Sequence, residues 1–205
     1  MDEPNRILND GLVVLDIQST PKQRESLLDF LRLLRKWNRV YNLTSVENPA
    51  AMVRLHLLDS LLILPYLHGA RILDVGTGAG LPGIPLAVMS PEKEFVLLDG
   101  SAKKTRFVRQ VAIELGLRNV RVVHERIERF SSTQGFDTIL SRAFASLSQI
   151  VTQTARLLAP GGAILAQKGK LPDDEIRQLG SVGVKIFPVK IPGVDAERHL
   201  IEITV

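Results

Sequence analysis

A glycine-rich turn that directly follows a short apolar strand constrains the fold of this chain more than any other feature. Ile72, Leu73 and Val75 form an apolar run typical of a central parallel strand, and Gly76-Thr77-Gly78-Ala79-Gly80-Leu81-Pro82-Gly83 follows it. Three alternate glycines let the backbone turn sharply and approach a ligand without Cβ atoms in the way. Pro82 suits the first turn of a helix. Together these residues predict an α/β sheet with a ligand site beyond the carboxyl end of the strand.

The same turn is compatible with two classes of ligand. Gly78 to Gly83 matches the GxGxxG dinucleotide pattern letter for letter, but that pattern alone is weak support. Asp74 lies two residues before Gly76, and we expect its carboxylate at the lip of the pocket, where it would repel a pyrophosphate. A cationic ligand suits this position better. The turn therefore favours S-adenosylmethionine, which carries a sulfonium and an amino group, over a nicotinamide dinucleotide or a structural turn without a ligand.

A second acid supports an adenosine-type ligand. Asp99 ends the apolar strand that begins at Glu94, and it lies nineteen residues after Gly80. An acid at the end of the second strand is placed to accept hydrogen bonds from the ribose hydroxyls. This spacing fits NAD and S-adenosylmethionine equally, so it does not choose between them.

The rest of the chain alternates between helical and strand patterns. Helices are predicted over 4–18, from 21 to about 37, about 48–66, 82–89, 102–115, about 146–158 and 173–179. Strands are predicted over 72–75, 94–99, 119–124, 136–141, 163–167, 183–189 and 198–205. We expect a helical N-terminal extension over 1–68, packed on a ligand-binding α/β domain over 69–205 that ends in an antiparallel hairpin.

Composition excludes several classes of function. The chain has no cysteine and four scattered histidines, so we expect no disulfide, no cysteine nucleophile and no metal site. Its longest apolar runs are far shorter than a membrane span. The N-terminus begins Met-Asp-Glu-Pro-Asn and lacks the basic and apolar regions of a signal peptide, so we expect a cytoplasmic protein without a membrane anchor.

The charge distribution points to a polyanionic partner. The net charge of +4 arises entirely within 69–205, and 101–142 holds nine Lys and Arg against four Asp and Glu. Four of these cations, Lys103, Lys104, Arg106 and Arg109, lie on one predicted helix beside the ligand site. Such clustering is typical of nucleic-acid binding. A solvated basic face kept for solubility is the alternative.

Several segments together resemble one methyltransferase family. The acid-x-Gly-x-Gly-x-Gly turn is similar to that of class I methyltransferases in general, whereas the Asn-Leu-Thr and His-x-x-Asp-Ser segments are more particular. The chain resembles, over roughly residues 25–200, the ribosomal RNA small subunit methyltransferase G family, also called glucose-inhibited division protein B. The resemblance rests on Trp37-Asn38-Arg39-Val40-Tyr41-Asn42-Leu43-Thr44, His56-Leu57-Leu58-Asp59-Ser60, Asp74 to Pro85, Lys103-Lys104-Thr105-Arg106-Phe107, Ser141-Arg142-Ala143 and Gln167-Lys168-Gly169.

This resemblance implies a class I (Rossmann-like) fold, a mostly parallel seven-stranded sheet with helices on both faces. It implies an enzyme that uses S-adenosylmethionine to methylate N7 of a guanine in 16S ribosomal RNA, with the RNA or the small ribosomal subunit as partner. We expect a monomer, although the sequence does not determine the oligomeric state. By resemblance, Gly76 and Leu81 line the methionine and ribose side, Ile127 and Glu128 meet the adenine, and Arg142 borders the pocket. With the acids and the turn, the expected cofactor-binding residues are Asp74, Gly76, Gly78, Leu81, Asp99, Ile127, Glu128 and Arg142.

The expected chemistry needs no general base. Guanine N7 has a free lone pair, so its methylation removes no proton, and positioning is expected to dominate the rate. We therefore identify no proton-abstracting residue. We expect Asn42, His56, Arg142 and Lys168 to orient the target base. An unstacked base in an RNA loop can enter such a pocket.

Other functions remain open from the sequence. One is a methyltransferase that acts on another RNA, a protein or a small molecule, and another is a non-catalytic ribosome-binding module that keeps the fold. The intact turn from Asp74 to Gly80, with Asp99, disfavours the second.

Overall fold

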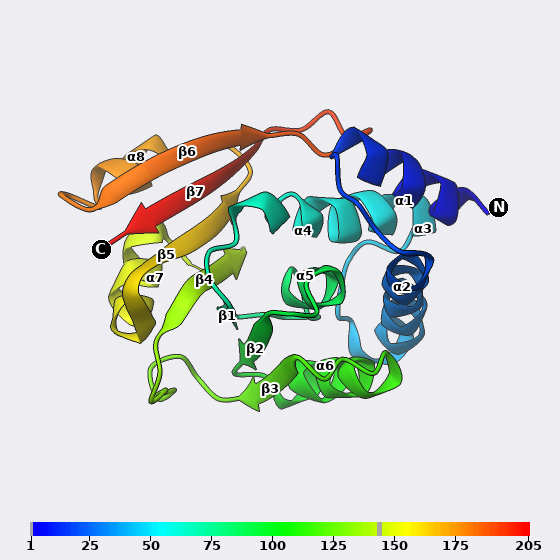
Figure 1. Cartoon of the computed structure of the whole chain (residues 1–205), viewed down its shortest axis with the longest axis horizontal. Coiled ribbons are helices and arrows are strands. Elements are labelled where there is room, and N and C mark those ends of the chain that lie inside the picture. The colour runs from blue at the N-terminus through cyan, green and yellow to red at the C-terminus, as the bar shows by residue number, and fades with distance from the viewer. Residues whose placement is uncertain (1, 143–144) are drawn as a thin grey trace.

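The computed structural model describes residues 2–142 and 145–205, and within them seven strands form one sheet (Figure 1). The spatial order of the strands is β3-β2-β1-β4-β5-β7-β6. Strands β1 to β5 are parallel, and β7 runs antiparallel to both of its neighbours, β5 and β6. The strands are β1 (Arg71–Val75), β2 (Glu94–Asp99), β3 (Val120–His124), β4 (Phe136–Arg142), β5 (Leu158–Lys168), β6 (Gly183–Val189) and β7 (Arg198–Thr204). The predicted mostly parallel sheet with a closing hairpin is confirmed.

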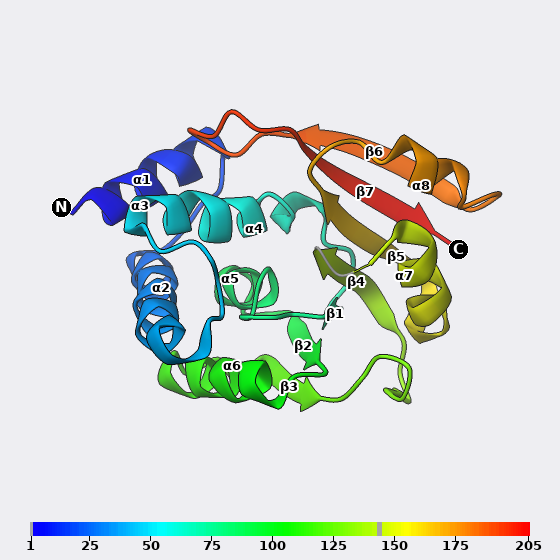
Figure 2. The same ribbon diagram turned by 180° about the vertical axis from the view of Figure 1, so that it is seen from behind.

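Helices cover both faces of this sheet, and the N-terminal helices add a further layer on one of them (Figures 1 and 2). Helices α4, α5 and α6 lie on one face, with α1 and α2 outside them, while α7 and α8 lie on the other. The helices are α1 (Glu3–Val14), α2 (Pro21–Tyr41), α3 (Pro49–Met52), η1 (Val53–Leu58), α4 (Asp59–Leu61), η2 (Leu64–Tyr66), α5 (Gly83–Met89), α6 (Ala102–Glu114), α7 (Leu147–Thr154), η3 (Ala155–Leu157) and α8 (Asp173–Arg177).

Two apolar clusters hold the layers together, one on each face of the sheet. Ile72 belongs to the same cluster as Leu34 and Leu57 of the N-terminal helices, whereas Leu73 belongs to the cluster that contains Leu147 of α7. Successive residues of β1 thus face opposite sides, as the pleat of a strand requires. The N-terminal helices therefore share one continuous cluster with the sheet.

The predicted helix over 48–66 is not one regular helix. After α3 the backbone widens into the π-helical segment η1, returns to an α-turn in α4 and ends in the 3₁₀ segment η2. Periodicity predicts a helix here but not its pitch. π-Helical segments occur frequently at functional sites, and this one carries His56 and leads directly into Asp59.

Other boundaries also differ from the prediction. Helix α1 ends at Val14, and α2 continues to Tyr41, where Asn42 adopts a left-handed φ of 47°. Strand β5 begins at Leu158, five residues before the predicted start, because Leu158 pairs with Phe136 ahead of a register shift, after which Ala163 pairs with Thr138. A Cβ on Gly162 would lie 2.7 Å from the Phe136 carbonyl oxygen, so glycine allows the backbone to approach β4 closely here. Of the Ser141-Arg142-Ala143 segment, Ala143 lies outside the described residues.

Candidate active site

The glycine turn has the backbone conformation that its sequence predicts. Gly76, Gly78 and Gly80 have φ values of 67°, 60° and 83°, a region that side chains with a Cβ rarely adopt. The turn is held to β2 by a hydrogen bond of 3.0 Å from the Thr77 backbone N–H to the Leu98 carbonyl. The carboxyl ends of β1 and β2 therefore meet at one edge of the sheet.

Asp74 does not lie at the lip of a pocket, so that prediction is wrong. Its side chain is completely buried, and its Oδ2 accepts hydrogen bonds from the Thr77 hydroxyl at 2.6 Å and the Gly83 N–H at 2.9 Å. It points to the same face of the sheet as Ile72, where α5 covers it. Burial raises the pKa of Asp74 to about 6, although these two hydrogen bonds oppose the rise. In the described structure its Oδ1 has no hydrogen-bond partner.

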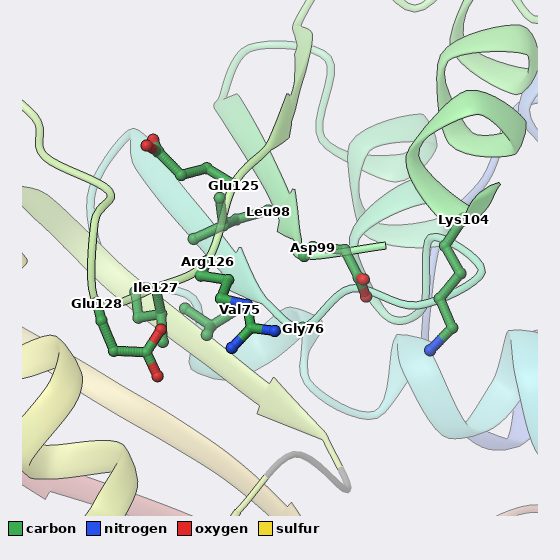
Figure 3. A pocket seen from close by; sticks show the side chains of 10 residues that line it. Val75, Gly76, Leu98, Asp99, Lys104, Glu125, Arg126, Ile127 and Glu128 are labelled. Carbon is green, nitrogen blue, oxygen red and sulfur yellow. The ribbon is translucent and has the colours of Figure 1, made fainter. Parts of the chain in front are cut away.

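A pocket of about 320 Å³ opens where β1 and β2 end (Figure 3). Asp99 and Lys104 stand on one side of it, and Ile127 and Glu128 stand on the other. The lining residues are Val75, Gly76, Leu98, Asp99, Gly100, Lys104, Glu125, Arg126, Ile127 and Glu128. We call this the first pocket.

Backbone donors fix the carboxylate of Asp99 in the first pocket. The Gly78 N–H donates to Oδ2 at 2.9 Å, and the Ser101 N–H donates to Oδ1 at 2.8 Å. Each carboxylate oxygen keeps a second lone pair. Asp99 is therefore already oriented to accept a further hydrogen bond from a ligand hydroxyl.

The structure brings together four of the eight predicted cofactor residues. Gly76, Asp99, Ile127 and Glu128 line the first pocket, and Gly78 supports Asp99 from behind. Leu81 does not line this pocket, because it is buried in the apolar cluster under α5. The sequence analysis assigned no role to Arg126. Its position directly before Ile127 could have indicated that it also lines the pocket.

A second pocket, of about 470 Å³, opens where the neighbouring strands β4 and β5 end. It contains Arg142, which the family resemblance had assigned to the border of the cofactor pocket, together with His56 and Lys168. Its lining residues are Val46, Leu55, His56, Asp59, Arg142, Gln167, Lys168, Gly169 and Arg198. Asn42 is exposed and does not line this pocket, because it ends α2 before the chain turns toward Val46.

Asp59 is the buried centre of the second pocket. Its carboxylate accepts from Nη1 of Arg142 and from Nε of Arg198, each at 3.2 Å. The Gln167 side-chain amide donates to the Asp59 backbone carbonyl at 2.7 Å and ties it to β5. The sequence interpretation gave no role to Asp59 beyond the His-x-x-Asp-Ser segment, and it missed Arg198 entirely.

The other two polar residues of the second pocket are held by neighbours. His56 Nε2 lies 2.9 Å from the Thr44 hydroxyl, and its buried Nδ1 has no partner among the described residues. Burial, and then the charge of Arg142, lowers the pKa of His56, so its ring is neutral at pH 7. Lys168 Nζ lies 2.8 Å from a carboxylate oxygen of Glu175, which partly neutralises it. The pocket thus presents a neutral imidazole among cations.

The two pockets together can accommodate a two-substrate reaction. Val75 of β1 pairs with Leu98 of β2 on one side and with Ser141 of β4 on the other, so both pockets open at the same edge of the sheet.

No group of three His, Cys, Asp or Glu side chains that could hold a metal ion occurs among the described residues. No helix in the described part of the chain is long and apolar enough to cross a membrane.

Comparison with known proteins identifies close relatives. The family model described as rRNA small subunit methyltransferase G matches residues 23–201. A ribosomal RNA small subunit methyltransferase G of Methylococcus capsulatus is 58% identical over 198 residues, which cover 96% of this chain and 97% of the relative. The protein of the same name from Nitrosococcus oceani is 50% identical over 199 residues, which cover 96% and 93%.

Solved structures of lower identity share the fold. A glycopeptide N-methyltransferase in complex with S-adenosylmethionine has a TM-score of 0.64 at 13% identity, covering 73% of this chain and 86% of its own. The fibrillarin of Aeropyrum pernix with natively bound S-adenosylmethionine has a TM-score of 0.55 at 20% identity, covering 72% of each chain. The chain therefore has the class I methyltransferase fold.

Proposed function

The chain belongs to the ribosomal RNA small subunit methyltransferase G family, and from that premise we propose that it methylates N7 of one guanine in 16S ribosomal RNA. It is an S-adenosylmethionine-dependent methyltransferase of small-subunit ribosomal RNA. The observation that carries the proposal is the pair of adjacent pockets at one edge of the sheet, one lined by Asp99 and the other by Arg142. Two reactants held in neighbouring pockets can be aligned for direct transfer.

The first pocket suits the cofactor. Asp99, oriented by two backbone N–H groups, accepts from ribose hydroxyls, and Ile127 gives an apolar wall for the adenine. Asp74 supports the glycine turn from within the core, because its Oδ2 accepts from the Thr77 hydroxyl and the Gly83 N–H. When bound, S-adenosylmethionine supplies an electrophilic methyl group on a sulfonium. We propose that Gly76, Asp99, Ile127 and Glu128 hold it, with Asp74 and Gly78 in supporting positions.

The second pocket suits the target guanine. Val46 and Leu55 provide apolar surface for a base, and Arg142 and Arg198 provide oriented donors for the guanine carbonyl or its phosphate. Arg142 and Arg198 share the single carboxylate of Asp59, so this group of three keeps a net positive charge. We propose that these residues hold the base and exclude water, and that residues 1–68 contribute to this pocket through Val46, Leu55, His56 and Asp59.

No residue in the second pocket needs to accept a proton. N7 attacks with its own lone pair, so the chain must orient the base and tolerate the cationic ring that forms. The neutral ring of His56 suits that task, because a protonated ring would add a further positive charge to those already beside the cationic product. We propose that His56 and Lys168 position the base and that Asn42 contributes only to the shape of the loop.

The partner we propose is 16S ribosomal RNA, either free or in the small subunit, with a monomer acting in the cytoplasm, where that RNA resides. Lys103, Arg106 and Arg109 lie exposed on α6, and Lys104 of the same helix lines the first pocket. Their charge favours approach of the RNA backbone to this edge of the sheet.

Incubation of the purified protein with S-adenosylmethionine and small ribosomal subunits that lack the modification tests the proposal. N7 methylation makes the RNA chain break at one guanine after borohydride and aniline treatment. Thermal denaturation with S-adenosylhomocysteine and with NAD tests the cofactor separately, since a ligand at 100 times its Kd stabilises the native state by about 2.7 kcal/mol. Stabilisation by NAD alone, or methylation at a position other than N7, would contradict the proposal.

A further inference from the structure

A third pocket, of about 270 Å³, lies between the last turns of α2 and the segment that leads into α3. In Figure 2 this segment runs back along α2 toward α3. The completely buried Met52 and the partly buried Val46 contribute apolar lining, and polar side chains make up the rest. The lining residues are Arg35, Asn38, Arg39, Val46, Glu47 and Met52.

The two arginines of the third pocket carry unpaired charge. Arg35 and Arg39 are exposed, lie four residues apart on one helical face, and form no ion pair in the described part of the chain. Like charges at this spacing repel each other unless an anion lies between them. Arg32, one turn earlier, differs because both Glu25 and Asp29 pair with it. Glu47 is the acid among the lining residues, so the pocket keeps an excess of positive charge.

The third pocket lies beside the second pocket, and hydrogen bonds hold the segment between them in place. Val46 lines both. The Asn38 side-chain oxygen accepts from the backbone N–H groups of Leu43 at 2.6 Å and Thr44 at 2.9 Å. The Thr44 hydroxyl then accepts from the Val46 N–H at 3.1 Å and contacts His56. These bonds fix the spacing of the two pockets before any ligand binds, which lowers the entropic cost of binding.

An extended polyanion fits this arrangement better than a small ion does. A nucleotide held in the second pocket is part of a strand, and Val46, which lines both pockets, marks a direct path for that strand from the second pocket to the third. Single-stranded RNA carries one phosphate for each nucleotide, and grooves that bind it combine cations along the backbone with apolar surface. The third pocket offers two free guanidinium groups beside apolar lining at that place.

We propose that the third pocket binds a backbone phosphate of the RNA strand that flanks the target nucleotide, with Arg35 and Arg39 as the contacting groups. The inference rests on the proposed function, because it takes RNA as the ligand. It assigns α2 a direct role in substrate binding, separate from the pocket where the base is methylated.

The salt dependence of binding to a labelled single-stranded oligoribonucleotide of mixed sequence measures these contacts. Each phosphate contact contributes roughly 0.7 to the slope of log K against log salt for single strands. Arg35→Gln and Arg39→Gln should each flatten the slope by about 0.7, and the double variant by about 1.4. Arg32→Gln is the matched control, since its charge is already neutralised, and it should leave the slope unchanged. Glu47→Gln should tighten binding at low salt.

Methylation of small ribosomal subunits separates this proposal from the proposed function. The Arg35→Gln, Arg39→Gln double variant should raise KM for the subunit at least tenfold, with kcat, affinity for S-adenosylhomocysteine and the unfolding midpoint unchanged. A wild-type protein that fails to methylate the RNA refutes the proposed function. An active wild type with unaltered slopes in the variants refutes only this site. A raised KM for subunits with unaltered oligoribonucleotide binding would also overturn it, because the partner of α2 would then be an acidic protein segment.

Discussion

Arg142 at the end of β4 donates a hydrogen bond of 3.2 Å to Asp59, which lies 83 residues earlier in the chain. The other oxygen of the same carboxylate accepts from Arg198, 139 residues away from Asp59. Since Asp59 is 5% exposed and its carboxylate is shared, both guanidinium groups are held in fixed directions. We infer that Asp59 acts on the substrate through the two arginines that it orients.

Replacing Asp59 should therefore impair methylation without affecting the cofactor. In Asp59→Asn the amide can accept from one arginine only, so the other loses its orientation. We expect kcat to fall on the order of 10²-fold, the loss that small misplacements of reacting groups cause. Single-turnover methylation measures the rate, and calorimetry with S-adenosylhomocysteine should give the wild-type Kd.

Glu94→Gln is the matched control for this variant, since Glu94 pairs with Arg71 at the opposite edge of the sheet and its side chain is half exposed. It should leave the rate unchanged. An Asp59→Asn protein with wild-type kcat and KM would show that the arginines need no common anchor.

Replacing Asp99 should weaken cofactor binding. Asp99→Ala removes a charged acceptor that the Gly78 and Ser101 N–H groups hold in the first pocket. A hydrogen bond to a charged group contributes about 1.5–3 kcal/mol, so Kd for S-adenosylhomocysteine should rise roughly 10- to 100-fold. Calorimetry measures this rise, and RNA affinity serves as the internal control. Equal Kd values for the variant and the wild type would remove Asp99 from the site.

The rate of methylation should not depend on a titrating base. Because burial and Arg142 lower the pKa of His56 from 6.5, this ring is neutral over the working range and has no charge to lose. Single-turnover rates at saturating cofactor should be flat between about pH 6.5 and 9, whereas an essential base gives about a tenfold fall per pH unit below its pKa.

His56→Asn keeps a polar side chain and should lose far less activity than Arg142→Ala, which removes one of the oriented donors of the second pocket. An inactive His56→Asn protein that still binds cofactor and RNA, together with a sloping pH profile, would show that the reaction needs a base.

Asp74 should make the protein less stable as pH rises through the mildly acidic range. Its native pKa of about 6 lies above the ordinary 3.8, so the native state binds the proton more tightly than the unfolded chain does. The stabilising contribution is fully present below pH 3.8 and is lost as pH rises through about 6, a loss of about 3 kcal/mol at most. Urea denaturation at several pH values in this range measures the free energy of unfolding. In Asp74→Asn this free energy should not show the decline that wild type shows as pH rises.

The carboxyl groups of Glu175 and Glu202 make stability depend on pH in the opposite direction. Hydrogen bonds to Lys168 and to His68 contribute to lowering the pKa of Glu175 and of Glu202 from 4.5, although burial opposes the effect, so their contributions are lost as pH falls. Wild type and Asp74→Asn share these contributions of Glu175 and Glu202. The contributions therefore cancel when the free energy of unfolding of one protein is subtracted from that of the other. Parallel stability curves for the two proteins would show that the pKa of Asp74 does not change on folding.

The sequence by itself determined the order of elements and the place of the first pocket, where we propose that the cofactor binds. Apolar runs and helical spacing are local properties, so they located β1, β2 and β6 within a residue or two. The glycine turn and Asp99 also depend on local backbone geometry and on strand ends, which the sequence records directly. Gly76 and Asp99 line one pocket, as the turn and the strand end predicted, together with Ile127 and Glu128, which only the family resemblance had implied.

Only the tertiary structure decided which face each polar side chain occupies and which distant residues meet. Asp74 is buried because α5 closes over it, and no local pattern shows which helix covers a given strand face. The π-helical widening before Asp59 and the pairing of β7 with β5 bring Asp59, Arg142 and Arg198 together from three separate segments. Such contacts depend on how whole layers pack, and packing is set by the summed burial of many side chains rather than by the residues of any one segment.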